Sequence, residues 1–474
     1  MQDKLDAVFS LNDKESFKKV IERTLESVLS SINDESAFSG IDPYTLRKEV
    51  TNLGLIDKEG LGFDKVLTDT KKVILPNLLR PWSTSYMPHL HSPVLPESLA
   101  AEIIISFFNN SMDSWDQAPA ATELEVYVID ELLKMVGFNS GDGTFTSGGS
   151  QSNFSAITAI RDAWINKNLK HDVKKLGLPK EYNRLRLYTS SISHFSMDKS
   201  AHVLGLGYNA VRHIPVDEYC RIDTIEFEKM LKEDTAKGLL PFCAVATIGT
   251  TDFGSIDDVK KMRELCDKYG LFLHADAAYG SGLLLSDKYS SKAKDLHLAD
   301  SITIDFHKMF LLNISCSCVL FKDKDLLPCF ELHADYLNRE EDEADGYINL
   351  VGKGMQTTRR FDALKVYMAF RSRGFKGYSE IINRAVENAK YFYNKIKSDK
   401  RFITGPEPEI SSVVFALNRD DEVNKKLRRD LLSEGTVIGQ TVFKGKVMLK
   451  FTLLNPALSE EKIDSLINRI LKAY

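Results

Sequence analysis

The chain has 474 residues, of which 43% are hydrophobic and 27% charged, a balance that is ordinary for a soluble globular protein. Its formal net charge of −5 argues against nucleic acid or an anionic membrane surface as a partner. The charged first residues argue against a signal peptide, and no apolar run is long enough to span a bilayer. Six scattered cysteines without a C-x-x-C pair predict a reducing compartment, with the cytoplasm as the default.

Three regions with different patterns follow one another along the chain. Residues 1–88 are predicted to be mostly helical, because apolar residues recur at helical spacing in SFKKVIERTLESVLSSI. Over residues 89–370, short apolar strands such as PFCAVATIGT and DSITIDF alternate with helical segments, which predicts a large domain with a mostly parallel sheet. Residues 371–474 hold a long helix and two further strand-like runs, which predict a small C-terminal α+β domain.

A turn with two glycines follows the first predicted strand, in GTFTSGGSQSN. Gly148 and Gly149 would let backbone N–H groups approach an anion, and Ser150 and Gln151 open a helix whose N-terminus favours negative charge. The lysine of a P-loop is missing here. An ordinary glycine turn with serine capping is the alternative, and this stretch taken alone favours it.

Two further strand ends carry polar residues. His194 follows a strand and precedes a helix, a place where a lone histidine is more often structural than catalytic. Asp276 ends the apolar strand of GLFLHADAAYG, and a buried carboxylate there needs a cationic partner. The small residues after it leave room for a flat ligand, although Asp276 could instead cap the next turn.

The stretch SITIDFHKMFLLN places Lys308 between two apolar runs. A buried ammonium is costly unless it is paired or neutral, so this lysine either reaches water from a strand end or is covalently occupied. Ligands of parallel sheets bind at the carboxyl ends of the strands, where these features would meet. Pyridoxal phosphate needs all of them, because it forms a Schiff base with a lysine and keeps its pyridine nitrogen protonated beside an aspartate.

The ordered motifs of the chain resemble a known family. Five motifs are similar to those of the group II pyridoxal-phosphate-dependent amino acid decarboxylases: SGGSQSN, ATIGTTDFGSIDD, HADAAYG, ADSITIDFHK and QTTRRFDALK. The greatest similarity is to the branch with 2,4-diaminobutyrate and siderophore-pathway diamino acid decarboxylases, and it is carried by HSPVLPESLAAE, DFHKMF, HADYLN and FTLLNP. The lysine motif reads D-F-H-K here, as in that branch, whereas much of the wider family has N-P-H-K. The resemblance implies PLP fold type I, an aspartate aminotransferase-like α/β architecture. It also implies a homodimer with active sites at the interface, in which residues 1–88 pack on the dimer partner.

The resemblance also implies roles for individual residues. Lys308 would carry the cofactor and Asp276 would partner its pyridine nitrogen, as catalytic residues together with His194. His194 and Ala278 would pack on the two faces of the ring. The other cofactor-binding positions would be Gly149, Ser150, Gln151, Ser301 and His307 around the phosphate, with Thr251 near the ring.

The proton donor in this family is often a tyrosine on a mobile loop. The acidic run at residues 338–346 lies in the corresponding region, with Tyr336 before it and Tyr347 after it. Tyr347 is nearer the family position, but its spacing from the later RRF motif departs by a few residues. The acidic run could form a lid, or simply a solvated surface loop.

Four residues are candidates for substrate binding. Asp113 and Asp116 could pair with a basic side chain, with structural capping as an equal alternative. His91, near His89, is expected to line the substrate entrance, because two histidines without further ligands do not indicate a metal. Lys450 could meet the substrate carboxylate, or merely end a strand.

These features predict a carboxy-lyase that uses pyridoxal phosphate. The expected substrate is a diamino acid (2,4-diaminobutyrate, ornithine or lysine) or an amide conjugate of one, converted to an amine and CO₂ in siderophore or polyamine biosynthesis. A second hypothesis is a decarboxylase of glutamate, aspartate or an aromatic amino acid. A third is a non-catalytic scaffold of the same fold, against which the presence of Lys308, Asp276 and His194 argues.

Overall fold

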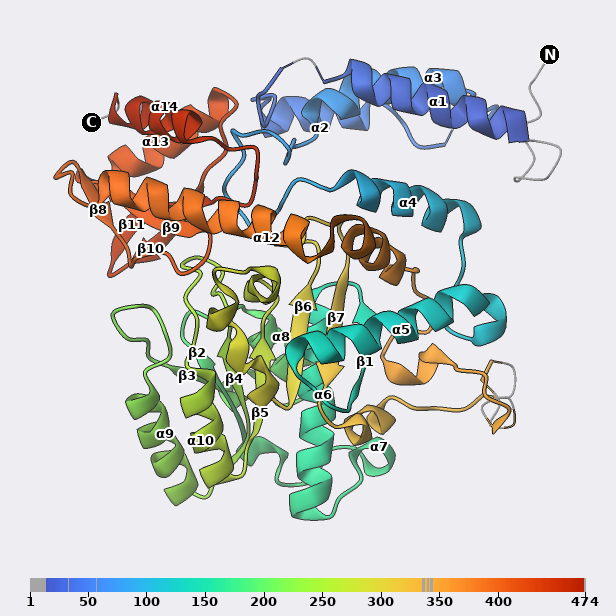
Figure 1. Cartoon of the computed structure of the whole chain (residues 1–474), viewed down its shortest axis with the longest axis vertical. Helices are drawn as coiled ribbons and strands as arrows, with labels where there is room; N and C mark the ends of the chain where they lie inside the picture. The colour runs from blue at the N-terminus through green and yellow to red at the C-terminus, as the bar shows by residue number, and fades with distance from the viewer. Residues whose placement is uncertain are drawn as a thin grey trace.

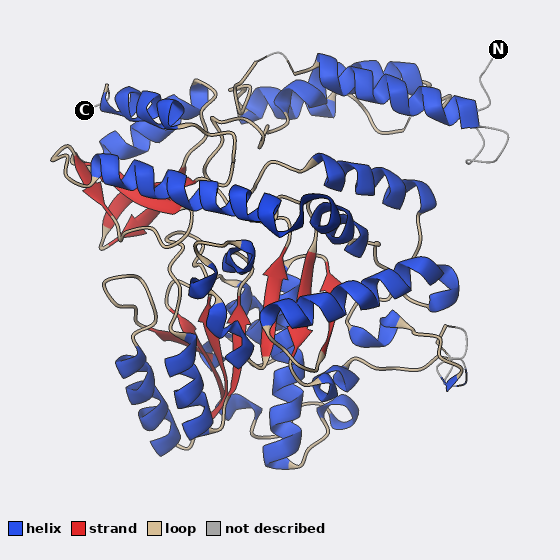
Figure 2. Ribbon diagram, viewed as in Figure 1, coloured by secondary structure: helices blue, strands red, loops and turns tan. Residues whose placement is uncertain are grey.

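Two β-sheets organise the chain. The computed structural model describes residues 14–32, 34–56, 58–334, 337–338, 341 and 344–472 (Figure 1). Its strands form one sheet of seven and one of four, and helices surround both (Figure 2). The predicted α/β class, with a large mostly parallel sheet and a small separate one, is confirmed.

The large sheet has the strand order β1-β7-β6-β5-β4-β2-β3. Strand β7 runs opposite to the other six strands. It pairs antiparallel with β1 and with β6, and the remaining pairs are parallel. The strands are β1 (Asp142–Thr146), β2 (Leu185–Ser190), β3 (Val211–Ile214), β4 (Leu240–Thr247), β5 (Phe272–Asp276), β6 (Ser301–Asp305) and β7 (Ser317–Phe321). The parallel strands β4, β5 and β6 therefore end at one edge of the sheet.

Helices cover both faces of this sheet, which is why its central strands are apolar throughout. Val245 of β4 packs in one cluster with residues of α6 and α8, whereas its neighbours Ala244 and Ala246 pack in another with residues of α5, α9 and α10. This alternation is the period of two expected for a strand. The helices are α5 (Pro119–Val136), α6 (Gly149–Leu169), α7 (Val173–Leu176), α8 (Ser196–Val203), α9 (Thr224–Ala236) and α10 (Val259–Tyr269).

The C-terminal part forms the second sheet, with the antiparallel order β10-β11-β9-β8. Phe392, Phe415 and Phe451 form its aromatic core, with ring centroids 4.8–5.0 Å apart. The long helix α12 (Ala363–Ile396) joins both parts and kinks at Gly374, so the predicted boundary at residue 371 falls inside this helix and stays a prediction. The other elements are β8 (Phe402–Thr404), β9 (Ser412–Leu417), α13 (Asp421–Ser433), β10 (Gly439–Phe443), β11 (Lys446–Thr452) and α14 (Glu460–Leu471).

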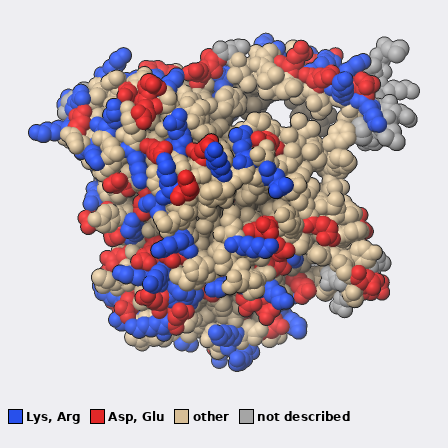
Figure 3. Space-filling model, viewed as in Figure 1, with Lys and Arg blue, Asp and Glu red and all other residues tan. Residues whose placement is uncertain are grey.

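Three N-terminal helices lie as a layer above the rest of the chain (Figure 1). They are α1 (Lys14–Ser30), α2 (Pro43–Thr51) and α3 (Phe63–Asp69), and the next helix, α4 (Pro96–Phe108), lies below them and contacts α12. No residue of α1, α2 or α3 is buried, and the apolar stripe of α1 is exposed. Figure 3 shows an opening between this layer and the body, and charges of both signs interspersed over the visible face. None of the described helices is long and apolar enough to cross a membrane.

Candidate active site

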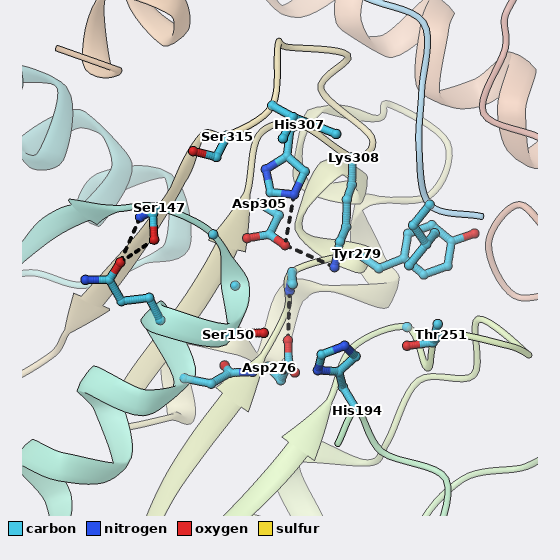
Figure 4. A pocket seen from close by; sticks show the side chains of 18 of the residues that line it. Ser147, Ser150, His194, Thr251, Asp276, Tyr279, Asp305, His307, Lys308 and Ser315 are labelled. Carbon is cyan, nitrogen blue, oxygen red and sulfur yellow. Dashed lines mark hydrogen bonds and ion pairs between the residues drawn. The ribbon is translucent and has the colours of Figure 1, made fainter. Parts of the chain in front are cut away.

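A cavity of about 430 Å³ opens where β4, β5 and β6 end. Thr247, Asp276 and Asp305, the last residues of these strands, all line it. The side chains drawn in Figure 4 converge on this space from several elements. Nine predicted site residues line the cavity: Gly149, Ser150, Gln151, His194, Thr251, Asp276, Ala278, His307 and Lys308.

The glycine turn brings backbone close to the cavity at the start of α6. A Cβ atom on Gly149 would lie 2.7 Å from Asp305 Oδ2, so a larger residue here would displace that carboxylate. The first amides of a helix have no partner within the helix, and α6 is 21 residues long. The amide of Ser147 donates to Gln151 Oε1 at 3.1 Å and its hydroxyl donates to the same atom, which holds this side chain in place. The turn therefore presents N–H donors suited to a phosphate.

A buried hydrogen-bond network positions Asp276. Its Oδ2 accepts from Asn153 Nδ2 at 2.9 Å, and its Oδ1 accepts from the amide of Ala278 at 3.2 Å. Asn153 Oδ1 lies 3.0 Å from His274 Nε2, and His274 Nδ1 lies 2.8 Å from Ser301 Oγ. Burial lowers the pKa of His274 to about 4, so this imidazole stays neutral. The carboxylate is thus held in one orientation by uncharged partners.

Lys308 follows β6 by one tight turn and reaches back to the strand's last residue. Its Nζ lies 3.0 Å from Asp305 Oδ2, and His307 Nε2 lies 3.6 Å from the same oxygen (Figure 4). Burial alone would raise the pKa of Asp305, but the charges of Lys308 and His307 hold it below its usual value. The lysine therefore enters the cavity beside a carboxylate that bears a negative charge.

His194 lies in the turn between β2 and α8 and faces the same space as Lys308 and Asp276 (Figure 4). Burial lowers its pKa, which favours the neutral ring at physiological pH. The amide of Ser196 donates to His194 Nδ1 at 3.2 Å, so the proton of the neutral ring belongs on Nε2. An uncharged imidazole in this position can pack against a flat ligand.

Comparison with known proteins identifies the family. The family described as "Pyridoxal-dependent decarboxylase conserved domain" matches residues 52–418. The chain belongs to the pyridoxal-dependent decarboxylases. It is therefore a carboxy-lyase, and its cofactor is pyridoxal phosphate.

Similar proteins match this decarboxylase over nearly its whole length. The L-2,4-diaminobutyrate decarboxylases of Acinetobacter baumannii and Rhizobium meliloti (strain 1021) are 35% and 33% identical to it. Both alignments cover 97% of this chain, with 94% and 92% of the respective relatives. A crystal structure of the glutamate decarboxylase domain of diaminobutyrate-pyruvate transaminase and L-2,4-diaminobutyrate decarboxylase from Vibrio parahaemolyticus superposes with a TM-score of 0.89 at 34% identity. That superposition covers 98% of this chain and 97% of the other.

The residues of the cavity fit pyridoxal phosphate. Lys308 would hold its aldehyde carbon covalently, and the first turn of α6, where Gly149 leaves room for close approach, would hold its phosphate. Asp276 would hold a proton on the pyridine nitrogen. His194 and Ala278 both line the space between these groups, as packing on the two faces of a ring requires.

One predicted cofactor contact needs correction, and three residues of the site had been given no role. Ser301 begins β6, at the far end of the strand from the cavity, and its hydroxyl contacts His274 instead of the phosphate position. His274 was not predicted, whereas Asn153 stands in the predicted turn and Asp305 at the predicted strand end, without an assigned role. A signal existed for His274, which stands two residues before Asp276 in an apolar strand and so faces the same side.

The two candidate proton donors lie apart from the cavity or outside the described residues. Tyr347 is 45% exposed, and its ring packs edge-on against Trp115 with centroids 5.0 Å apart. It does not line the cavity of its own chain. Tyr336 and part of the acidic run lie outside the described residues, so the lid and its tyrosine stay predictions.

The acidic substrate candidates do not reach the cavity of their own chain. Asp113 is buried, and its Oδ2 accepts from the hydroxyl of Ser111 at 2.9 Å. Asp116 accepts from the hydroxyl of Ser114. Within one chain both carboxylates therefore cap their own loop.

His91 and Lys450 lie beside the cavity without lining it. His91 Nδ1 is 3.2 Å from the hydroxyl of Tyr86. Lys450 Nζ is 2.8 Å from Asp252 Oδ1 and 3.5 Å from the carbonyl oxygen of the cavity residue Thr251. Among the described residues, no group of three or more His, Cys, Asp or Glu side chains could hold a metal ion.

Proposed function

We propose that this decarboxylase removes the α-carboxylate of L-2,4-diaminobutyrate, or of a related diamino acid such as ornithine or lysine or an amide conjugate, and releases the amine and CO₂. The observation that carries the reaction is the cavity that brings Lys308, Asp276 and His194 together. The choice of substrate is supported by the two relatives of that name, which match over 97% of the chain. Relatives named for aromatic or acidic amino acids match over 78–79% of it, at 30–32% identity.

The cofactor, Asp276 and His194 would each have a separate role in the reaction. The cofactor, when bound, supplies a ring that takes up the electron pair left on Cα when CO₂ departs. Asp276 would keep the ring nitrogen protonated, because a carboxylate favours a positive charge beside it. His194, neutral and partly buried, would exclude water from one face and hold the substrate so that the bond to the carboxylate is correctly oriented.

Decarboxylation of a panel of amino acids tests the substrate. Purified protein with added pyridoxal phosphate is expected to release CO₂ from one diamino acid faster than from glutamate, aspartate or tyrosine. Lys308→Ala, which removes the covalent attachment point, is the control and is expected to be inactive on every substrate. Faster release from glutamate, aspartate or an aromatic amino acid would support the second hypothesis instead. A protein that takes up the cofactor on Lys308 but releases CO₂ from no free amino acid would point to a conjugate substrate.

We also propose that two copies form a dimer that completes each active site. Support comes from α4, a helix with a mostly exposed apolar surface that ends shortly before Asp113 and Asp116. A second copy would cover that surface and receive these carboxylates near its cavity, where they would attract the distal ammonium of a diamino acid. The exposed apolar side chains of α4 are Leu99, Ile103, Ile104, Phe107 and Phe108.

Mixing two inactive variants tests this arrangement. Lys308→Ala and Asp116→Asn, which changes the exposed carboxylate of the pair, are each expected to be nearly inactive on the diamino acid when they are pure. After unfolding and refolding together in equal amounts, about one quarter of the wild-type activity should return, because half of the randomly paired dimers are hybrids with one intact site. Absence of any recovery from folded, dimeric mixtures would place Asp116 and Lys308 of one chain in the same site, and full activity of the pure aspartate variant would remove Asp116 from function. Sedimentation measures the mass, which is expected to be twice 53.5 kDa.

The cytoplasm is the proposed compartment. It is supported by the six cysteines, which all lie within the described residues and are all free thiols, five of them buried. Such thiols persist in a reducing environment. A role in siderophore or polyamine biosynthesis fits a diamine product and stays a prediction.

A further inference from the structure

The ion pair between Lys308 and Asp305 is a feature that the proposed reaction does not yet use. Asp305 is 2% exposed and Lys308 Nζ lies 3.0 Å from its Oδ2. The two residues are three positions apart, and the turn that joins them is closed by a bond from the Lys308 amide to the Asp305 carbonyl oxygen. The carboxylate and the lysine therefore belong to one turn, and both line the cavity.

Lys308 needs different charges at different times. It must be a neutral amine to attach to the cofactor, and it must leave again when the substrate takes its place. In that exchange the carbon–nitrogen bond to Nζ breaks as a bond to the substrate nitrogen forms. The proton that the substrate's α-ammonium gives up then has to be accepted, and Nζ of the departing lysine is a base that can accept it.

We propose that Asp305 is the positioning residue that receives Lys308 after its release, and that it holds the lysine as an ammonium ion until the product leaves. A carboxylate 3.0 Å from the amine, in a largely buried place, stabilises the charged form by direct attraction. Asp305 would thus favour release and delay premature reattachment. The inference rests on the proposed covalent role of Lys308.

The groups around this pair leave Asp305 as the natural partner of the lysine. From the same turn, His307 Nε2 lies 3.6 Å from Asp305 Oδ2 and can share that oxygen. From β5, Asp276 is already bonded to Asn153. The turn between β2 and α8 contributes His194, whose lowered pKa favours a neutral ring without a charge to pair with the lysine. On the side of α6, the backbone of Gly149 leaves no room for another side chain beside Asp305.

The rate of cofactor attachment to the cofactor-free, full-length protein tests this proposal. Attachment is followed by the visible absorbance of the lysine-bound cofactor, for the wild type and for Asp305→Asn. Attachment near neutral pH is expected to be about tenfold faster in the variant, because the amine that must react is no longer held as an ammonium ion by a carboxylate 3.0 Å away.

A parallel series with pyridoxal, which lacks the phosphate, separates two causes. Removal of a negative charge could speed attachment simply by reducing repulsion of the phosphate. The proposal requires the same acceleration with both compounds, because the same lysine reacts in each. Faster attachment with the phosphate compound alone, or an unchanged rate with both, would overturn it.

Two further variants complete the test. Asp142→Asn removes a carboxylate that pairs with Lys353 at the start of β1, remote from the cavity, and should leave the rate unchanged. Asp305→Ser provides a second substitution should the asparagine variant fail to fold, and the same acceleration is expected. Since no substrate is present in the assay, a wrong assignment of the substrate cannot produce or hide this result.

Discussion

Asp276→Asn is expected to lower kcat by about 10²–10³ while the cofactor remains attached to Lys308. The amide has nearly the same shape and can still accept from Asn153, but it carries no negative charge to hold a proton on the ring nitrogen. CO₂ release at saturating cofactor measures the loss, and the visible absorbance of the protein shows whether the cofactor is bound. A variant with full cofactor absorbance and near wild-type turnover would contradict the assigned role.

The network behind Asp276 supplies a graded comparison. Asn153→Ala keeps the charge of Asp276 and removes one hydrogen bond to it, so a smaller loss of kcat is expected than for Asp276→Asn. A loss as large as that of the charge-removing variant would mean that orientation of the carboxylate matters more than its charge. The pair of variants therefore separates the two effects.

Lys365→Met is expected to lower the free energy of unfolding by about 3–5 kcal/mol. Lys365 is fully buried, and its Nζ lies 2.9 Å from Glu102 Oε1 and from Asp362 Oδ1. It also donates to the carbonyl oxygen of Ser315, a residue of the cavity wall, at 2.9 Å. Methionine would fill the space but leave two carboxylates without their shared cation, so the loss of stability should be accompanied by weaker cofactor binding.

Urea unfolding followed by fluorescence measures this effect. Lys376→Met, on the exposed side of the same helix, is the matched control and should change the free energy of unfolding by no more than about 0.5 kcal/mol.

Burial raises the pKa of Asp362 even with Lys365 beside it, and removal of the lysine should raise it further. The folded state then binds this proton more readily than the unfolded state, so the deficit of Lys365→Met should shrink as the pH falls. Equal stability of the two lysine variants would refute the assigned role.

Much of the candidate site was predictable because its signals are local. Asp276 and Lys308 each follow an apolar strand, and the glycine turn precedes a helix. In a parallel sheet the ends of such strands meet at one edge, so their convergence follows from the pattern alone. The same residues indicated the cofactor and the family resemblance added the reaction, and the match over residues 52–418 confirmed both.

The partners that tune these groups were not predictable in the same way. His274 contacts Asn153 across 121 positions of the chain, and Ser301 proved to belong to this network instead of the phosphate site. No local pattern specifies a contact between residues so far apart. Asp113 and Asp116 show the same limit, because whether a carboxylate caps its loop or serves a second copy depends on an assembly beyond one chain.

The residue pattern was sufficient to predict the α/β class, the order of the elements and the lysine, aspartate and histidine at the strand ends, since strand periodicity and turn chemistry act over a few residues. The charge and orientation of those groups depend on the folded chain. The pairing of Asp305 with Lys308 and the neutral state of His274 and His194 arise from burial and from neighbours on other elements. Electrostatic energy depends on distance in space and on exclusion of water, and both are set when the chain folds.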